Sequence, residues 1–251
     1  MARSAARRLF LPAIAAAAVL CSAPARAEPV VADISNHLIA ITTGFTGTDM
    51  LVFGATDGEG DVVAIVRGPE REEIVRRKER MAGIWIHGAS HRFRRVPSFY
   101  AVAASKPLAE TAPQTVLARH QIGLDNLRLE SAEREDDPSR REFAQALIKL
   151  KQDEGLFPTK VEQVQFLGNQ LFRARIAFPS NVPVGTYTVE VFLLRNGEVA
   201  GAQTAPLVIS KIGLGADIYL FAHRDAPIYG AIAILMALVA GSSAAFLFRK
   251  A

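Results

Sequence analysis

Long apolar runs occur at both ends of the chain, and between them apolar residues come in short runs separated by polar turns. The C-terminal run, Ile228 to Phe248, has 21 residues and no charge. As a helix it would be about 31 Å long, which matches the hydrocarbon core of a bilayer. Arg249 and Lys250 follow it directly. The pattern predicts one transmembrane helix over residues 228–248, with residues 249–251 as a short tail.

The N-terminal run has the three parts of a secretory signal peptide over residues 1–27. Arg3, Arg7 and Arg8 precede a short apolar stretch, and Ala25-Arg26-Ala27 is a small-x-small cleavage site. An uncleaved N-terminal anchor is the alternative. Both forms export residues 28–227, and the basic tail then stays in the cytoplasm, as the positive-inside rule favours. We expect an inner-membrane protein whose bulk lies in the periplasm.

Residues 28–106 show short runs rich in Val, Ile and Thr, at a spacing typical of an all-β domain. Asp57-Gly58-Glu59-Gly60 lies between two of these runs and indicates a hairpin. The pattern predicts an immunoglobulin-like β-sandwich lobe. The expected strands are Val30–Ser35, His37–Thr42, Met50–Ala55, Val62–Arg67, Ile84–Ile86 and Phe99–Ala103.

Helical periodicity appears over residues 107–158. Pro113 is a favourable first residue for a helix in which Val116, Leu117 and His120 share a face. A second helix is expected after Ser139, because Glu142 completes a capping-box pattern. Its apolar positions recur at helical spacing up to Gly155 and Pro158, which should end it. We predict a helical insert in a mainly β fold. The apolar positions of the second helix are Phe143, Ala146, Leu147 and Leu150.

Residues 159–212 return to a β pattern, and residues 213–227 are expected to be a juxtamembrane linker. Asn196-Gly197, between Tyr187–Leu194 and Glu198–Ile209, strongly favours a hairpin turn. Gly185-Thr186-Tyr187 is similar to the tyrosine corner of immunoglobulin-like domains, although a strand tyrosine after a glycine turn is an equal alternative. These strands either form a second lobe with the helices or join the N-terminal strands in one sandwich.

The composition separates the targeting ends from the exported body. The chain has 29 Lys and Arg against 25 Asp and Glu, but four of the basic residues lie within 1–27 and two at positions 249 and 250. The body therefore holds 23 basic and 25 acidic residues, so the basic isoelectric point does not indicate nucleic-acid binding. The single cysteine, Cys21, leaves with the signal, which excludes disulfides and cysteine metal sites from the mature chain.

The densest charge feature is residues 67–95, with nine basic and four acidic side chains. On a β-strand, Arg76, Lys78 and Arg80 lie on one face. They are the candidate contact for an oxyanion, an acidic partner or anionic lipid headgroups. A solvated edge strand, whose charges prevent sheet-to-sheet aggregation, is the favoured alternative. Residues 125–154 hold nine acidic and six basic residues, and pairing with them would weaken the case for an external anion.

Patterns for catalysis or metal binding are weak. His87 and His91 are four residues apart, but Gly88-Ala89-Ser90 between them argues against a helix, so we expect exposed loop histidines. His120 is expected to be partly buried on its helix. The sequence has no Gly-x-Ser-x-Gly elbow, phosphate loop, dinucleotide glycine pattern or His-Glu-x-x-His helix. We predict no catalytic residue, no metal and no cofactor.

The predicted membrane helix carries small residues at every fourth position: Ala233, Ala237, Gly241 and Ala245. Such a stripe lets two helix backbones approach closely. The run contains six alanines, so a stripe that arises from composition alone is the alternative. The partner would be a second copy or a helix of a neighbouring permease.

Several short motifs are shared with a known family, and they extend over nearly the whole chain. They are Gly44-Phe45-Thr46-Gly47, Arg67-Gly68-Pro69-Glu70, Arg76-Arg77-Lys78-Glu79-Arg80, Gly83-Ile84-Trp85, Val96-Pro97-Ser98-Phe99-Tyr100, Arg119-His120-Gln121-Ile122-Gly123-Leu124 and Phe221-Ala222-His223-Arg224. Together they resemble the uncharacterised alphaproteobacterial transmembrane family. The resemblance implies a signal, one membrane anchor and no assigned activity. Members are often described beside sulfite-exporter-like permeases, which makes such a permease a candidate partner.

These observations favour a non-catalytic role. We expect a membrane-anchored periplasmic module that binds or scaffolds another envelope component, such as a transporter. A periplasmic accessory protein that binds or senses an anion through the arginine-rich strand is one alternative. An enzyme of unrecognised type is the other, and it should show polar residues that converge on an enclosed pocket.

Overall fold

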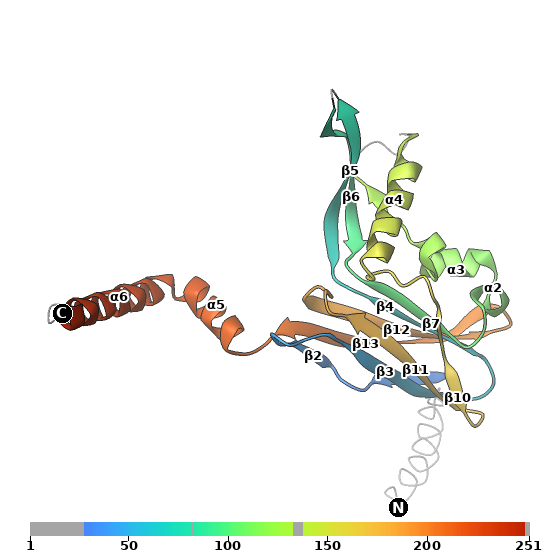
Figure 1. Ribbon diagram of the computed structural model, residues 1–251. Helices are drawn as coiled ribbons and strands as arrows, with labels where there is room; N and C mark the ends of the chain where they lie inside the picture. Colours follow the sequence, from blue (N-terminus) through green and yellow to red (C-terminus); the bar gives the residue numbers. More distant parts are fainter. Residues whose placement is uncertain (1–27, 82, 133–137, 249–251) are drawn as a thin grey trace, which may run out of the picture.

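The computed structural model describes residues 28–81, 83–132 and 138–248, and it is built mostly of β-strands (Figure 1). Two larger sheets form the body. A long two-stranded hairpin projects from this body, helices lie beside the hairpin and over one sheet, and a C-terminal helix extends away from it. The mainly β prediction is confirmed. The predicted signal peptide, 1–27, and the predicted tail, 249–251, lie outside the described residues.

The first sheet has four strands and is antiparallel throughout, in the order β1-β3-β11-β10. On β11, apolar residues alternate with exposed arginines, so one face is buried and the other meets solvent. The buried side chains of this strand are Phe172, Ala174, Ile176 and Phe178. The strands are β1 (Val30–Ile34), β3 (Gly47–Thr56), β11 (Leu171–Pro179) and β10 (Gln165–Leu167).

The second sheet has six strands in the order β2-β13-β12-β4-β7-β9. Val62 to Val66 of β4 are all buried, because the first sheet covers one side of this strand and the helical segment the other. The outer pairs β13–β2 and β7–β9 are parallel. The strands are β2 (Leu38–Ile41), β13 (Glu198–Lys211), β12 (Gly185–Arg195), β4 (Asp61–Arg67), β7 (Tyr100–Ala104) and β9 (Glu162–Gln163).

Strands from residues 28–106 and 159–212 share both sheets. In the first sheet β3 pairs with β11 over nine residues, and in the second β4 pairs with β12. Aromatic rings join the two sheets, with Phe178 of β11 lying 4.9 Å from Phe99 and 6.0 Å from Tyr187 of β12. The two ranges therefore build one body with a shared core.

The prediction of a hairpin across Asp57-Gly58-Glu59-Gly60 is wrong. The strand before this turn, β3, belongs to the four-stranded sheet, and the strand after it, β4, belongs to the six-stranded sheet. The turn carries the chain from one sheet to the other, and Arg195 holds it by contacts with the Asp57 carboxylate and the Glu59 carbonyl. By contrast, the hairpin at Asn196-Gly197 is confirmed, and both turn residues have positive φ, 51° and 77°.

The Tyr187 hydroxyl donates a hydrogen bond of 2.6 Å to the carbonyl of Pro183, four residues upstream. A tyrosine corner makes a hydrogen bond of this kind. The immunoglobulin-like character of the sandwich itself stays a prediction.

The helical segment contains both helices expected from the sequence. The helix after Pro113 is α3 (Gln114–His120), and the helix after Ser139 is α4 (Arg140–Asp153). Gly155, with φ of 72°, follows the end of α4. Shorter elements flank them: α2 (Leu108–Thr111), the 3-10 turn η1 (Leu124–Asn126) and β8 (Glu130–Ser131).

The C-terminal helix α6 (Ala226–Phe248) contains the predicted span 228–248. Its segment Ala226–Ala244 is long and apolar enough to cross a membrane, with a mean hydropathy of 1.7, and none of it is buried against the body. Residues 213–227, the expected juxtamembrane linker, contain a second helix, α5 (Leu214–Arg224), and the first residues of α6. The chain thus has one candidate membrane span among the residues that the structure describes.

Candidate functional site

The feature that stands out from the body is a long antiparallel hairpin made of β5 (Glu70–Met81) and β6 (Ile84–Pro97), here called the projecting hairpin. Twelve residues in β5 give it a length of about 40 Å. At its far end Met81 pairs with Ile84, and Gly83 has φ of 87°, a conformation that glycine adopts without strain. In Figure 1 it rises from the body beside α4.

One face of the projecting hairpin, here called the helix face, packs on α4. His91 and Phe93 of β6 are fully buried, and the His91 ring stacks 5.7 Å from the ring of Phe143 on α4. Val75 of β5 and Leu147 of α4 are buried in the same cluster. This contact holds the lower part of the hairpin to a rigid helix.

His91 corrects a sequence expectation. It was expected to be an exposed loop histidine, but it lies in β6 with no exposed surface, and its Nε2 atom is 2.9 Å from the Ser131 hydroxyl. His87 is exposed, as expected, and lies in the same strand. His120 is half-buried, as expected, with its ring 5.2 Å from that of Phe192.

Some of the charged residues in 67–95 form ion pairs within the protein. On the helix face, Arg77 pairs with Glu142 at 2.6 Å and Glu73 pairs with Lys151 at 2.7 Å, so α4 and β5 exchange two ion pairs. Near the base, Arg95 donates to Glu70 at 2.9 Å and to Glu130 at 3.3 Å. The hydrogen bond to Glu70 raises the pKa of Arg95. The internal pairing that the sequence raised as an alternative is therefore real for these residues.

Arg76, Lys78 and Arg80 lie on the opposite face of β5, here called the open face, because Arg77 between them points to α4 and strand residues alternate. All three are exposed. Within the described part of the chain, no ion pair or hydrogen bond engages them. The structure thus brings the three predicted contact residues together on one solvent-facing surface. Because β5 is the edge strand of the small sheet β5-β6-β8, the edge-protection alternative also fits their position.

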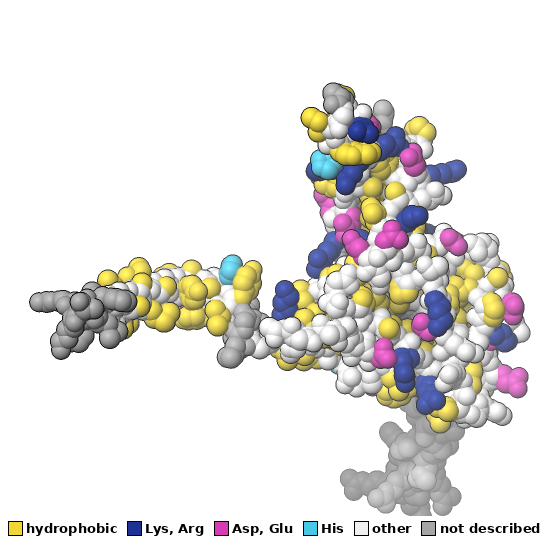
Figure 2. Space-filling view, viewed as in Figure 1, with side chains coloured by type: hydrophobic (Ala, Val, Ile, Leu, Met, Phe, Trp, Pro, Cys, Tyr) yellow, Lys and Arg dark blue, Asp and Glu magenta, His cyan; other side chains and the backbone are white. Residues whose placement is uncertain are grey.

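The far end of the hairpin is apolar, which the sequence analysis missed. Met81, Ile84 and Trp85 have exposed fractions of 64%, 68% and 66%, and Ile86 has 37%. In Figure 2, hydrophobic and basic side chains gather at this end of the molecule. We call these four residues the tip. Ile84, Trp85 and Ile86 were expected to form a strand, which is correct, but nothing local in the sequence indicates that this strand extends beyond the body.

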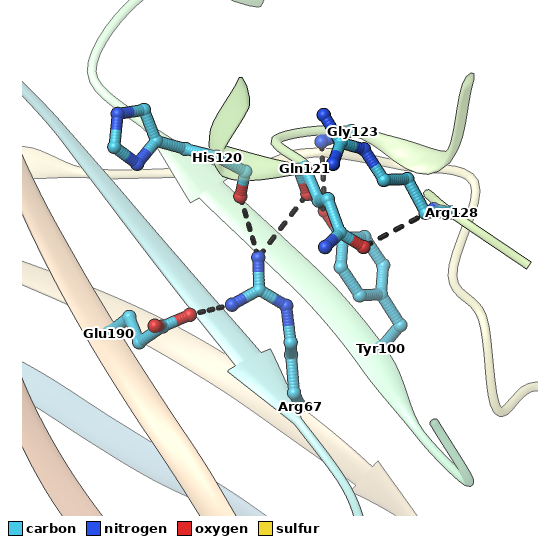
Figure 3. A network of polar contacts seen from close by, with 7 residues as sticks. All are labelled: Arg67, Tyr100, His120, Gln121, Gly123, Arg128 and Glu190. Carbon is cyan, nitrogen blue, oxygen red and sulfur yellow. Dashed lines mark hydrogen bonds and ion pairs between the residues drawn. The ribbon is translucent and has the colours of Figure 1, made fainter. Parts of the chain in front are cut away.

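A second polar cluster surrounds Arg67 at the end of β4 (Figure 3). The guanidinium pairs with the Glu190 carboxylate of β12 and donates to the carbonyl of His120 at 2.7 Å and of Gln121 at 3.4 Å. These carbonyls lie at the C-terminal end of α3, where a cation is favoured. Burial lowers the pKa of Arg67.

Tyr100 completes this cluster. Its hydroxyl donates to the Gln121 carbonyl at 2.7 Å and accepts from the Gly123 amide at 2.8 Å, and Gln121 itself has the left-handed φ of 52°. Burial raises the pKa of Tyr100 to about 12. Arg67 of β4 and Tyr100 of β7 both bind carbonyls at the end of α3. These contacts indicate that the cluster fixes α3 on the six-stranded sheet.

The arrangement offers little for metal or cofactor chemistry. Among the described residues, no group of three or more His, Cys, Asp or Glu side chains is placed to hold a metal ion. The gap between the two larger sheets is lined largely by apolar side chains such as Ile34, Val52 and Val191, and it has no room for a water molecule. Its lining does not bring catalytic groups together.

The predicted small-residue stripe lies on α6. Ala233, Ala237 and Gly241 are exposed, and no atom lies within 4 Å of where a side chain on Gly241 would begin. Ala245 belongs to the same helix, and its side chain lies outside the described part of the structure. No described residue covers Ala233, Ala237 or Gly241, and the role of the stripe as a packing surface stays a prediction.

The comparison with known proteins agrees with this architecture. Residues 29–250 match the family described as "Putative transmembrane protein (Alph_Pro_TM)", which covers the sandwich, the projecting hairpin and α6. No curated protein matches the chain. The match extends over far more than half of the sequence, and the one candidate span in the described residues fits the family description. The chain belongs to the Alph_Pro_TM family of transmembrane proteins.

Proposed function

We propose that this protein is a non-catalytic binding or scaffolding module, anchored in the inner membrane by α6, with its body in the periplasm and the projecting hairpin as its contact element. The single observation that carries the proposal is the tip. A soluble β-strand rarely exposes four large apolar side chains together, and such surfaces usually mark a site of contact with a protein or a membrane.

The electrostatics of the hairpin support the same assignment. The helix face uses its charges internally, through Arg77–Glu142 and Glu73–Lys151. The open face keeps the charges of Arg76, Lys78 and Arg80 for solvent or a ligand. The lower part of the hairpin is held by α4 and the upper part is exposed to a partner. Because the hairpin is already held in place, little conformational entropy is lost when it binds.

A periplasmic accessory protein that binds an anion is the second candidate. The specific observation in its favour is the grouping of Arg76, Lys78 and Arg80 on one exposed face, where no acidic side chain among the described residues pairs with them. An anion alone does not account for the exposed Trp85 and Ile84, so we place this candidate second. A transporter, such as a sulfite-exporter-like permease, is the envelope component that the family context suggests as a partner.

The test is purification of the full-length chain in a mild detergent, followed by mass spectrometry of the proteins and lipids that accompany it. The variant Ile84→Ser/Trp85→Ser makes the tip polar, and Leu38→Ser/Val208→Ser serves as a control that removes two exposed apolar side chains from the pair β2–β13. The proposal predicts that the tip variant loses a companion that the control keeps. Identical companions for all three chains would contradict it.

A further inference from the structure

The tip is apolar on both faces of the hairpin. Residues directly opposite each other in an antiparallel pair share a face, so Met81 and Ile84 lie on the helix face and Trp85 lies with Arg80 on the open face. A binding groove in a protein usually covers one face of a strand pair. Apolar side chains on both faces instead suit insertion into a medium that is apolar all round, such as the outer part of a bilayer.

Basic side chains lie directly behind the tip. Lys78 pairs across the hairpin with His87, and Arg80 pairs with Trp85, so both cations lie within a few residues of the apolar end. Residues 76–87 hold four basic residues and one acidic residue, Glu79. Lys and Arg place their aliphatic stems along apolar surface while the charged group stays in the headgroup region. Tryptophan is likewise enriched at the membrane interface.

The base of the hairpin lies near the strand that leads to the membrane anchor. Pro69, at the base of the hairpin, lies so close to Gly185 that a Cβ on Gly185 would be 2.7 Å from the Pro69 ring. Gly185 pairs with Ile209, near the end of β13, and β13 leads through Gly213 to α5 and α6. The base of the hairpin therefore lies near the end of β13, and α5 connects this point to α6. In Figure 1 the hairpin runs across the direction of α6, so the tip reaches the bilayer that holds α6 when the body leans toward the membrane at α5.

We infer that the tip of the projecting hairpin inserts into the interface of the same bilayer that holds α6, with Met81, Ile84, Trp85 and Ile86 at the acyl boundary and Arg76, Lys78 and Arg80 on anionic headgroups. This inference rests on the proposed function, because it names the ligand of the same contact element. The anchor keeps the tip at a high local concentration near the lipid, so a contact that would be weak between separate molecules is sufficient. Two attachments then fix the orientation of the sandwich over the membrane.

The test uses Trp85, which is the single tryptophan of the chain. The full-length protein is reconstituted in nanodiscs of phosphatidylcholine alone, or of phosphatidylcholine with phosphatidylglycerol, and each set is repeated with lipids brominated in the acyl chain. The expected result is a blue-shifted emission that brominated lipid quenches, strongest with phosphatidylglycerol. Added salt should reverse the effect of the anionic lipid, because it screens exposed charges.

Two variants with the same change in net charge test whether the effect of anionic lipid depends on the open face or only on the net charge of the protein. Arg76→Gln/Lys78→Gln/Arg80→Gln should shift the ratio of inserted to free tip by about a hundredfold in anionic nanodiscs. Arg119→Gln/Arg173→Gln/Arg175→Gln, which changes exposed residues of α3 and β11, should leave the Trp85 emission unchanged. Far-UV circular dichroism confirms that both chains are folded.

The inference is overturned if Trp85 keeps the emission of a water-exposed tryptophan, without bromine quenching, in nanodiscs that contain phosphatidylglycerol. If a protein companion is nevertheless lost from the tip variant in the purification experiment, the hairpin binds that protein and the proposed function stands. If the tip variant loses neither lipid nor protein contact, the inference and the proposed function both fall.

Discussion

The cluster around Arg67 gives the sharpest prediction on stability. The variant Arg67→Met keeps most of the packing of the side chain but removes its charge and its donors. It leaves the Glu190 carboxylate without its cation and the His120 carbonyl without the 2.7 Å hydrogen bond. Arg67→Met therefore loses the ion pair, the 2.7 Å hydrogen bond and the longer 3.4 Å contact with the Gln121 carbonyl, and that carbonyl keeps only its bond from Tyr100.

The magnitude follows from the exposure of the pair. The Arg67 and Glu190 side chains are 23% and 26% exposed. Breaking a fully buried pair by removing one partner costs about 3–5 kcal/mol, and an exposed pair contributes about 1 kcal/mol or less. A pair that is one quarter exposed should cost roughly 2 kcal/mol, and the lost hydrogen bond adds about 1 kcal/mol. We expect Arg67→Met to lower the free energy of unfolding by about 3 kcal/mol.

The assay is urea unfolding of the full-length chain in a mild detergent, followed by far-UV circular dichroism. A loss of this size lowers the midpoint by about 1–1.5 M urea for a body of this length. Arg95→Met is the control, since Arg95 pairs with two acidic residues but is exposed, and the midpoint of this variant should hardly move. The double variant Arg67→Met/Glu190→Leu should be less destabilised than the sum of the single variants, because no unpaired charge remains. A wild-type midpoint for Arg67→Met, or strict additivity in the double variant, would refute the reasoning.

Three further predictions concern other parts of the chain. A reporter that is active only in the periplasm should work when fused after Ser210 and fail after Ala251; the opposite result would reverse the orientation. Burial raises the pKa of Tyr100 and of Tyr187 to about 12, so the folded state keeps its proton where the unfolded state has lost it. Stability should therefore fall between about pH 10 and 12, by at most about 2.7 kcal/mol for each tyrosine. Over this range the urea midpoint of Tyr100→Phe/Tyr187→Phe should decrease less with pH than that of the wild type, and an equal decrease would contradict the assignment. Ala237→Leu/Gly241→Leu should preserve insertion while reducing helix association in a membrane two-hybrid assay, and association that survives the change would make the stripe a matter of composition.

Local signals in the sequence predicted local structure well. Asn196-Gly197 determined its hairpin because both residues readily take positive φ, and the uncharged run at 228–248 is sufficient to define a helix that needs no partner. The turn Asp57–Gly60 misled, since turn residues specify a change of direction and not the sheet that the next strand joins. β3 and β4 each have one partner strand more than a hundred residues away, β11 and β12 respectively.

The candidate site shows the same division. Alternation alone placed Arg76, Lys78 and Arg80 on one face, and the structure agrees. The burial of His91 depends on Phe143 of α4, which no pattern near His91 reveals. The Arg67 cluster joins β4, β7, β12 and the end of α3, so its partners have no fixed spacing in the sequence. The exposure of Trp85 depends on where the body ends, and this is a property of the assembled sheets.

The central claim, that the projecting hairpin is the contact element, is tested most directly by the accessibility of its tip in native membranes. Cys21 is the single cysteine, so a chain with Cys21→Ser accepts one reporter thiol at a time. Ile84→Cys reports on the tip, and Arg175→Cys on an exposed position of β11. Both are treated with a charged maleimide in osmotically lysed membranes, and total thiol is measured after denaturation. The account predicts that Ile84→Cys is protected in membranes while Arg175→Cys reacts fully. Equal and complete reaction at the two positions would contradict it.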